Sequence, residues 1–233
     1  MYIFYHPELH EQQSNITLTE SEAHHALHVL RLKSGTPVQV MNGRGLLASG
    51  LLHTAKKNCS VSLQTIYTQQ PAPKPVRLII APPKTKDRLH FMLEKLTELQ
   101  VHEITLTRTA NSERNTVRLD KLKYQLIAAC KQSGNAYLPE LMLHKNLQES
   151  IESTQDYQRF IAYTPRRDSD QLVRQTLSST ATALFIGPEG GFLPEEVDLC
   201  ERNGIQPVGL GPLRLRTETA AIYGLATIQT LMP

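Results

Sequence analysis

The sequence predicts an α/β protein with two domains, a small β-barrel and a larger domain built on a mostly parallel sheet. Three prolines within residues 69–76 indicate a semi-rigid connector, because proline continues neither a helix nor a central strand. Short apolar stretches separated by turns precede this connector. Strand-like and helix-like segments alternate after it, which is typical of a parallel sheet covered on both faces. The predicted domains are residues 1–70 and 76–233.

The first domain is predicted to be mostly β. Its strand-like stretches are residues 37–41, 45–52 and 59–66, with Asn42-Gly43 as the clearest turn signal. One helix is expected over residues 19–32, because Thr19 and Glu22 have the spacing of a capping box. The apolar residues that then share one face are Ala23, Ala26, Leu27 and Leu30.

The second domain alternates strands and helices. Its predicted strands are residues 76–82, 103–107, 159–164, 182–187 and 205–211, and its predicted helices are residues 86–101, 118–133, 194–203 and 217–232. Pro194 at the start of the third helix and Gly204 just past its end follow the usual asymmetry of helix termini. Sheets of this kind bind ligands at the carboxyl ends of their strands.

The charge of the chain is uneven. The net charge is +3, yet residues 74–131 hold twelve lysines and arginines against six acidic residues. A basic face of this kind attracts a polyanion, most often a nucleic acid. Lysines scattered over a solvated helix surface remain the alternative interpretation.

The three cysteines, Cys59, Cys130 and Cys200, are too widely spaced for a disulfide framework or a metal knuckle, which favours a reducing, cytoplasmic setting. No apolar run reaches the length of a membrane span, and the N-terminus has no signal-peptide pattern, so no membrane association is expected. His24 and His28 have a metal-ligand spacing but lack a third ligand nearby. Partly exposed histidines are therefore the favoured interpretation, and no metal is expected.

A glycine-rich turn, 184-LFIGPEGGF-192, follows one predicted strand. The chain contains neither the dinucleotide pattern G-x-G-x-x-G nor the P-loop pattern. Glu189 within the turn would repel a phosphate, whereas bare backbone groups suit a neutral or cationic ligand resembling adenosine. The alternative is that Gly190 and Gly191 only turn the chain.

A second turn, 210-LGPLRLRTETA-220, follows the next predicted strand. Arg214 and Arg216 precede Thr217, which is placed to cap the final helix. Two arginines at a helix N-terminus oppose the helix dipole, and residues that break a local preference are enriched at functional sites. They are candidates for facing an RNA phosphate or orienting a base. The alternative is an ion pair with Glu189 or Glu218.

The two turns together resemble the signature of the RsmE family, the bacterial 16S rRNA uracil-N3 methyltransferases of the SPOUT (trefoil-knotted) superfamily. Residues 24–35 with 41–45 are similar to the family's N-terminal RNA-binding barrel of PUA-like type. Its central motifs are resembled by residues 83–101, 111–117 and 130–140. Three residues depart from the family pattern, namely Leu193 at a usual Ser or Thr, Gln100 at a usual Gly, and Lys131 at a frequent Glu.

The resemblance implies a deep trefoil knot that binds S-adenosylmethionine. Its cofactor loops map onto Tyr163, Thr164, Ile186, Gly187, Pro188, Glu189, Gly190, Gly191, Leu210, Gly211, Leu213, Leu215, Thr217 and Ala220. Arg214 or Arg216 would stabilise a uracil anion, and Glu189 or Glu218 would accept its proton. The expected RNA contacts are His24, Arg31, Lys33, Lys84, Arg88, Arg114, Gln132 and Ser133.

The resemblance further implies a homodimer, formed through the knotted domain, that acts on 16S rRNA of the small ribosomal subunit. A first rival is another SPOUT enzyme, such as a tRNA ribose 2′-O-methyltransferase, which the N-terminal barrel and the RTETA sequence disfavour. A second rival is a non-catalytic RNA-binding or assembly factor. The intact glycines at positions 187, 190 and 191 count against it, and failure to bind S-adenosylmethionine would favour it.

Overall fold

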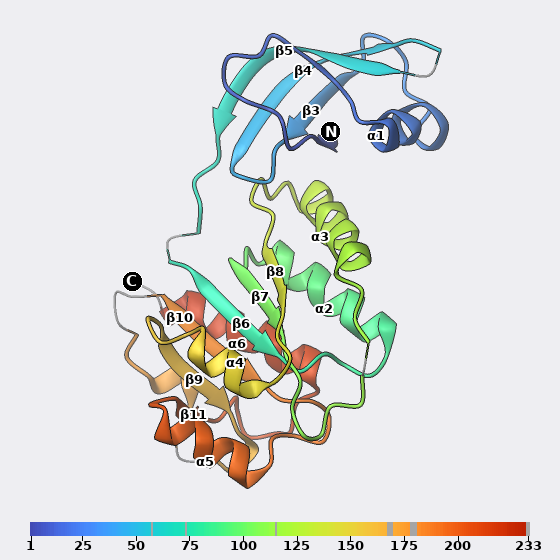
Figure 1. Cartoon of the computed structure of the whole chain (residues 1–233). Coiled ribbons are helices and arrows are strands. Elements are labelled where there is room, and N and C mark those ends of the chain that lie inside the picture. Colours follow the sequence, from blue (N-terminus) through green and yellow to red (C-terminus); the bar gives the residue numbers. More distant parts are fainter. Residues whose placement is uncertain (57, 73, 115, 167–169, 178–180, 232–233) are drawn as a thin grey trace. The chain divides into compact units, whose positions relative to one another are not determined.

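The structure, a computed structural model, describes residues 1–56, 58–72, 74–114, 116–166, 170–177 and 181–231 (Figure 1). Contacts divide the chain into two compact units. One consists of Met1–Pro71 and Ile127–Leu138, the other of Ala72–Leu126 and Pro139–Pro233. The domain limits 1–70 and 76–233 stay a prediction. The predicted end of the last helix, residue 232, lies outside the described residues.

The first unit is built on a five-stranded sheet. Its strands, in spatial order, are β1 (Tyr2–Tyr5), β3 (Pro37–Met41), β4 (Leu46–Thr54), β5 (Cys59–Thr68) and β2 (Asn15–Thr17). β1 pairs parallel with β3, and the other neighbours pair antiparallel. Alternate residues of β3 and β4 face a core that includes Phe4, Val40 and Leu52. The three predicted strands are confirmed, and β1 and β2 are additional.

The predicted helix over 19–32 is too long. Helix α1 (Glu20–His24) passes into one π-helical turn, η1 (His25–Val29). Arg31 then adopts φ +55°, a left-handed conformation that no α-helix continues. Only half of the capping box forms, because the hydroxyl of Thr19 accepts from the N–H of Glu22 at 3.4 Å while the Glu22 carboxylate turns to Lys131 at 2.7 Å.

Residues 127–138 belong to the first unit because they form hydrogen bonds and apolar contacts with it. The side chain of Gln69 accepts from the backbone N–H of Ala136 at 2.6 Å, and its carbonyl accepts from the hydroxyl of Tyr137 at 2.9 Å. Cys130 packs in a small buried cluster with Met41. Burial raises the pKa of the Cys130 thiol to about 12, so this thiol stays protonated at neutral pH.

The second unit is built on a six-stranded sheet in which every recorded pair of strands is parallel. Its strands, in spatial order, are β11 (Gln206–Val208), β9 (Gln158–Ala162), β10 (Thr182–Ile186), β6 (Val76–Ile80), β7 (Glu103–Leu106) and β8 (Glu140–Leu143). The α/β class with a mostly parallel sheet is thereby confirmed. Strand β8 is additional to the prediction.

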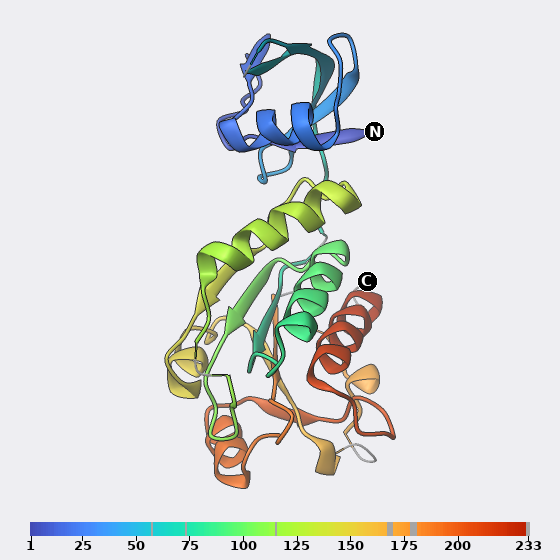
Figure 2. The ribbon, with the colours of Figure 1, turned by 90° about the vertical axis from the view of Figure 1, so that its right-hand side faces the viewer.

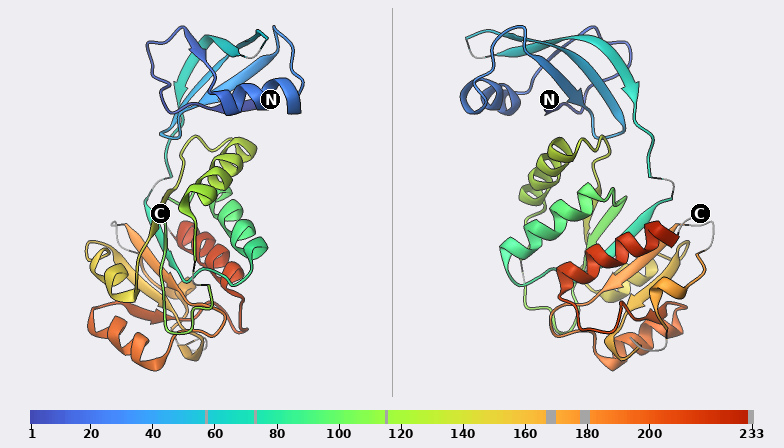
Figure 3. Two further views of the ribbon diagram at one scale, coloured as in Figure 1. Left: turned by 45° about the vertical axis from the view of Figure 1, so that its right-hand side comes forward. Right: turned by 180° about the vertical axis from the view of Figure 1, so that it is seen from behind.

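Helices cover both faces of this sheet, as predicted. The helices of the unit are α2 (Lys86–Glu98), α3 (Leu119–Ser133), α4 (Leu147–Glu152), α5 (Pro194–Arg202) and α6 (Thr217–Leu231), with α3 shared between the two units. Helices α2 and α6 lie side by side on one face (Figures 2 and 3). Helices α4 and α5 cover the other face, where they pack on Ile79, Ile161 and Phe185.

Several helix and strand ends differ from the prediction for local reasons. Helix α2 ends at Glu98 because Gln100 adopts φ +55°, the left-handed conformation that a glycine would adopt more readily. Strand β9 ends at Ala162, so Tyr163 lies in the loop beyond it, and Thr164 begins the short 3-10 turn η2 (Thr164–Arg166). Helix α5 starts at Pro194 without a side-chain cap from Leu193. Instead, the Glu196 carboxylate accepts from the N–H of Leu193 at 2.9 Å.

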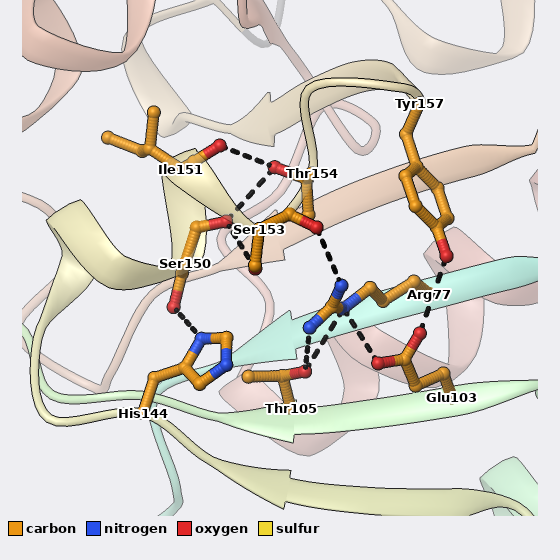
Figure 4. A network of polar contacts seen from close by, with 9 residues as sticks. All are labelled: Arg77, Glu103, Thr105, His144, Ser150, Ile151, Ser153, Thr154 and Tyr157. Atoms are coloured by element: carbon orange, nitrogen blue, oxygen red, sulfur yellow. Dashed lines mark hydrogen bonds and ion pairs between the residues drawn. The ribbon is translucent and has the colours of Figure 1, made fainter.

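A buried polar network lies beneath α4 (Figure 4). The guanidinium of Arg77 pairs with Glu103 at 3.1 Å and donates to the hydroxyl of Thr105 and the carbonyl of Ser153. Burial raises the pKa of Glu103, although the facing Arg77 acts in the opposite direction. Arg77 belongs to the basic segment counted from the sequence, yet its charge is paired with Glu103 inside the fold.

His144 extends this region and makes acid stability testable. Its Nδ1 lies 3.0 Å from the hydroxyl of Ser150, and burial lowers its pKa from the ordinary value of 6.5. The unfolded chain therefore binds more protons below about pH 6.5. Stability should fall as the pH drops from there through the lower folded pKa. The His144→Gln variant should lose less melting temperature between pH 7 and pH 5 than the parent chain does. His10→Gln, at an exposed position, is the control and should lose as much melting temperature as the parent chain. If His144→Gln also lost as much as the parent chain, His144 would not be the source of the acid sensitivity.

Candidate functional site

Three loops meet at the carboxyl edge of the parallel sheet. They follow β9, β10 and β11, which are neighbours in the sheet. Together they enclose a cavity of about 560 Å³, within the size range of small-molecule sites. The lining residues are Ala162, Tyr163, Thr164, Pro165, Ile186, Gly187, Pro188, Glu189, Gly190, Gly191, Phe192, Leu210, Gly211, Leu213, Arg214, Leu215, Thr217 and Ala220.

The cavity gathers all fourteen residues predicted to bind the cofactor, together with Arg214. Their binding role stays a prediction. Ala162, Pro165 and Phe192 line the cavity as well and were missed by sequence reasoning. Phe192 could have been included from the sequence, because it directly follows Gly190 and Gly191 in the glycine-rich turn. A Cβ on Gly187 would lie 3.1 Å from its ring, so the ring packs tightly against this glycine.

The glycine turn after β10 has little room for side chains. Gly191 adopts φ +74°. A Cβ on Gly190 would lie 2.9 Å from the Cβ of Asn111, whose side-chain amide donates to the carbonyl of Gly191 at 3.1 Å. The loop after β7 therefore supports the turn from behind. These contacts explain why the turn needs its glycines, and they leave backbone groups on the cavity wall.

The glycine turn and the last loop are bonded to each other. The hydroxyl of Thr217 donates to the carbonyl of Gly187 at 3.0 Å, and the guanidinium of Arg214 donates to the carbonyl of Glu189 at 2.7 Å. The interpretation of Thr217 as the cap of the final helix was wrong, because Thr217 is already the first residue of α6. Its hydroxyl joins two cavity walls.

The four candidates for catalysis occupy different environments. Glu189 and Arg214 line the cavity, whereas Arg216 is exposed and Glu218 is 6% exposed, and neither is among the lining residues. The alternative of ion pairs between the arginines of the last loop and the glutamates is not what forms. Within the described residues, the recorded cation partner of both Glu189 and Glu218 is Arg88, at 3.7 Å from each carboxylate.

The residues predicted to contact RNA lie in both units. Lys84 and Arg114 are in the second unit, and the backbone N–H of Lys84 donates to the carboxylate of Glu189 in the glycine turn. The Lys84 ammonium pairs with Glu113 at 2.5 Å, and the Arg114 guanidinium donates to the carbonyls of Pro83 and Lys84 at 2.8 and 2.7 Å. In the first unit, the exposed members of the set are His24, Arg31, Lys33, Gln132 and Ser133.

Metal binding finds no support in the described part of the chain. The rings of His24 and His28 lie 4.7 Å apart, but no group of three potential ligands occurs among the described residues. Across those same residues, no helix combines the length and the apolar character that a membrane crossing requires.

Comparison with known families places the motifs in context. Residues 70–229 match the model of the RNA methyltransferase domain, and residues 18–64 match that of the RNA methyltransferase PUA domain. The first match alone covers more than half of the chain. The chain belongs to the RNA methyltransferase family. The resemblance predicted from its motifs is confirmed, and the N-terminal domain is of the PUA type.

Relatives support the family over nearly the full length. The chain is 29% identical to the ribosomal RNA small subunit methyltransferase E of Bacillus subtilis, covering 94% of this chain and 91% of that one. A probable rRNA methyltransferase from Porphyromonas gingivalis is 33% identical, with a TM-score of 0.87 over 99% of this chain and 98% of that one. A Neisseria gonorrhoeae ribosomal RNA small subunit methyltransferase E bound to S-adenosyl methionine is 28% identical, with a TM-score of 0.88 over 99% and 98%.

The bond between Thr217 and Gly187 yields a prediction for this RNA methyltransferase. Thr217→Val keeps the shape of the side chain but leaves the Gly187 carbonyl without its donor. The free energy of unfolding should fall by about 1 kcal/mol. Thr230→Val is a matched control, because Thr230 lies on the same helix, is exposed, and donates its hydroxyl to the carbonyl of Ala226 in the preceding turn. Chemical denaturation checks both variants, and equal changes would contradict a special role for Thr217.

Proposed function

We propose that this chain transfers a methyl group from S-adenosylmethionine to N3 of a uridine in the 16S rRNA of the small ribosomal subunit. The single observation that carries the proposal is the cavity at the carboxyl edge of the sheet, which is lined by all fourteen residues that the family resemblance assigns to the cofactor. Family membership and the relatives named above support the same chemistry.

The cavity walls fit S-adenosylmethionine on physical grounds. Its volume of about 560 Å³ suits a ligand of this size, and glycines at positions 187, 190 and 191 bring backbone groups close to the ligand. Apolar side chains such as Ile186 and Leu215 supply the remaining surface. Glu189 tolerates the positive sulfonium and disfavours a phosphate. S-adenosylmethionine supplies the methyl group as a sulfonium, so no metal is required.

The residues of the chain would manage the charge on the uracil. N3 of uracil carries a proton, so one group must accept it and others must stabilise the anion. Among the predicted acceptors, Glu189 lines the cavity, while Glu218 is buried outside it. Glu189 is therefore the better placed acceptor. Arg214 lines the same cavity and, together with Arg216, would stabilise the anion.

The partners follow from the same proposal. The enzyme acts in the cytoplasm on the small ribosomal subunit, as a homodimer joined through its second domain, with the chain after β11 threaded into a trefoil knot. The PUA-type domain and the exposed cations of both units bind rRNA phosphates, which makes binding steeply dependent on salt. The target uridine must leave its stack to reach the cavity.

The decisive experiment is methylation of small ribosomal subunits from a strain that lacks the activity. Purified enzyme and labelled S-adenosylmethionine should yield N3-methyluridine at one site of 16S rRNA, found by mass spectrometry of nucleosides and mapping of the modified base. A ribose 2′-O-methyl product would replace the proposed reaction with that of another SPOUT enzyme. Failure to bind S-adenosylmethionine would favour a non-catalytic assembly factor.

Arg216 provides a prediction on the division of roles. Arg216→Ala should abolish methylation, because the variant loses a charge that would stabilise the uracil anion. The affinity for S-adenosylmethionine should stay largely intact, because Arg216 is exposed and is not among the residues that line the cavity. Methyl incorporation and calorimetric titration measure the two effects separately. Arg202→Ala, at an exposed position on α5, is the control and should retain activity. An equal loss of cofactor affinity in Arg216→Ala would refute this division.

A further inference from the structure

One guanidinium serves two carboxylates at the edge of the cavity. Arg88 lies in the first turn of α2, Glu189 in the glycine turn after β10, and Glu218 in the first turn of α6. The Arg88 Nη1 atom lies 3.7 Å from Oε1 of Glu189, and its Nε atom lies 3.7 Å from Oε1 of Glu218. Three segments that are distant in sequence therefore meet at this one side chain.

Glu218 needs such a cation because it is buried. Only 9% of its side chain is exposed, and its Oε2 atom is buried without a hydrogen-bond partner among the described residues. A buried carboxylate is strongly unfavourable unless a charge or a hydrogen bond compensates it. Arg88 is the recorded cation for this group. Without it, Glu218 would have to move toward water, and the first turn of α6 would move with it.

Glu189 is also held by the residues that precede Arg88 in the chain. Its Oε1 atom also accepts from the backbone N–H of Lys84 at 3.1 Å. The backbone at Lys84 is fixed in turn by the guanidinium of Arg114, which donates to its carbonyl at 2.7 Å. The loop between β6 and α2 thus fixes the one glutamate that lines the cavity, and Arg88 ties that glutamate to Glu218.

We propose that Arg88 is a positioning residue for methyl transfer, aligning Glu189 in the cavity wall through its link to Glu218 at the start of α6, and that it is not a contact to an RNA phosphate. The inference rests on the proposed function and deepens it. A free cation is what a phosphate attracts, and Arg88 already faces two carboxylates. Through Glu218 it also fixes the start of α6, whose Thr217 and Ala220 line the cavity.

The test compares Arg88→Gln with Arg88→Lys in turnover, rRNA affinity and cofactor affinity. Arg88→Gln should lower kcat by about tenfold to a hundredfold, because misplacing a catalytic group slightly has effects of that size. Its affinity for small-subunit rRNA should change by less than about twofold, whereas its affinity for S-adenosylmethionine should fall together with kcat, because Glu189, Thr217 and Ala220 line the cavity. Arg88→Lys should recover part of the turnover. Lys95→Gln, which removes an ion-paired cation elsewhere on α2, should match the parent enzyme.

A double-mutant cycle separates positioning through Glu218 from any independent effect. In a Glu218→Gln background, Arg88→Gln should cost less turnover than it does in the parent enzyme, because only its link to Glu189 is then left to lose. Fully additive losses would overturn the proposal. Weaker rRNA binding by Arg88→Gln, with a shallower salt dependence and unchanged kcat, would overturn it in favour of a phosphate contact.

The same cycle is also read by chemical denaturation, which needs no activity. The loss in denaturation midpoint caused by Arg88→Gln should shrink when Glu218 is already glutamine, because no buried charge is then left uncompensated. If the parent enzyme fails to methylate small subunits, the proposed function fails, while this coupling still reports on the link between the two residues. Additive midpoint shifts would refute the link itself, whatever the reaction.

Discussion

The parallel pairing of β10 on both sides is the constraint on which the site depends. β10 pairs in register with β9 on one side and with β6 on the other. Parallel strands end at the same edge of a sheet, so the loops after β6, β9 and β10 emerge together. β11 extends the arrangement by pairing with β9. The hydrogen bond from Thr217 to Gly187 then closes the last loop against the glycine turn.

Several cations of the basic segment form bonds inside the fold, which limits the charge that they offer to a ligand. The basic segment of the sequence contained Arg77, Lys84, Arg88, Arg114 and Lys131, and each of these is bonded within the fold. The exposed ion pair of Lys84 with Glu113 contributes little to stability in water. The pair of Arg77 with Glu103, by contrast, is buried. Counting charges in a sequence therefore overstates the basic surface that RNA meets.

The sequence predicted the elements that obey a strong periodicity or carry a terminal signal, and it missed those that do neither. Strand β8 is a half-exposed edge strand of four residues, too short for alternation to distinguish it from a loop. Helix α4 has six residues, and its one signal is Asn146, whose side chain accepts from Glu149. Long-range partners were also out of reach. Glu22 fits a capping box locally, yet its carboxylate is taken by Lys131, more than a hundred positions later in the chain.

The candidate site was likewise predictable only in part. Most of the walls were predictable because two motifs, the turns after β10 and β11, contain most of the residues that line the cavity. The electrostatic arrangement was not, because it depends on which cation the fold brings to Glu189 and Glu218. Sequence proximity favoured Arg214 and Arg216, which lie only four and two residues from Glu218, respectively. The fold instead brings Arg88 from α2, and it turns Arg214 toward a backbone carbonyl. Arg216 is thereby left exposed beside the cavity-lining Thr217, free of the glutamates that a local reading would have paired with it. An exposed arginine in that position is accessible to a substrate that arrives from solvent, as the proposed reaction on an RNA base requires.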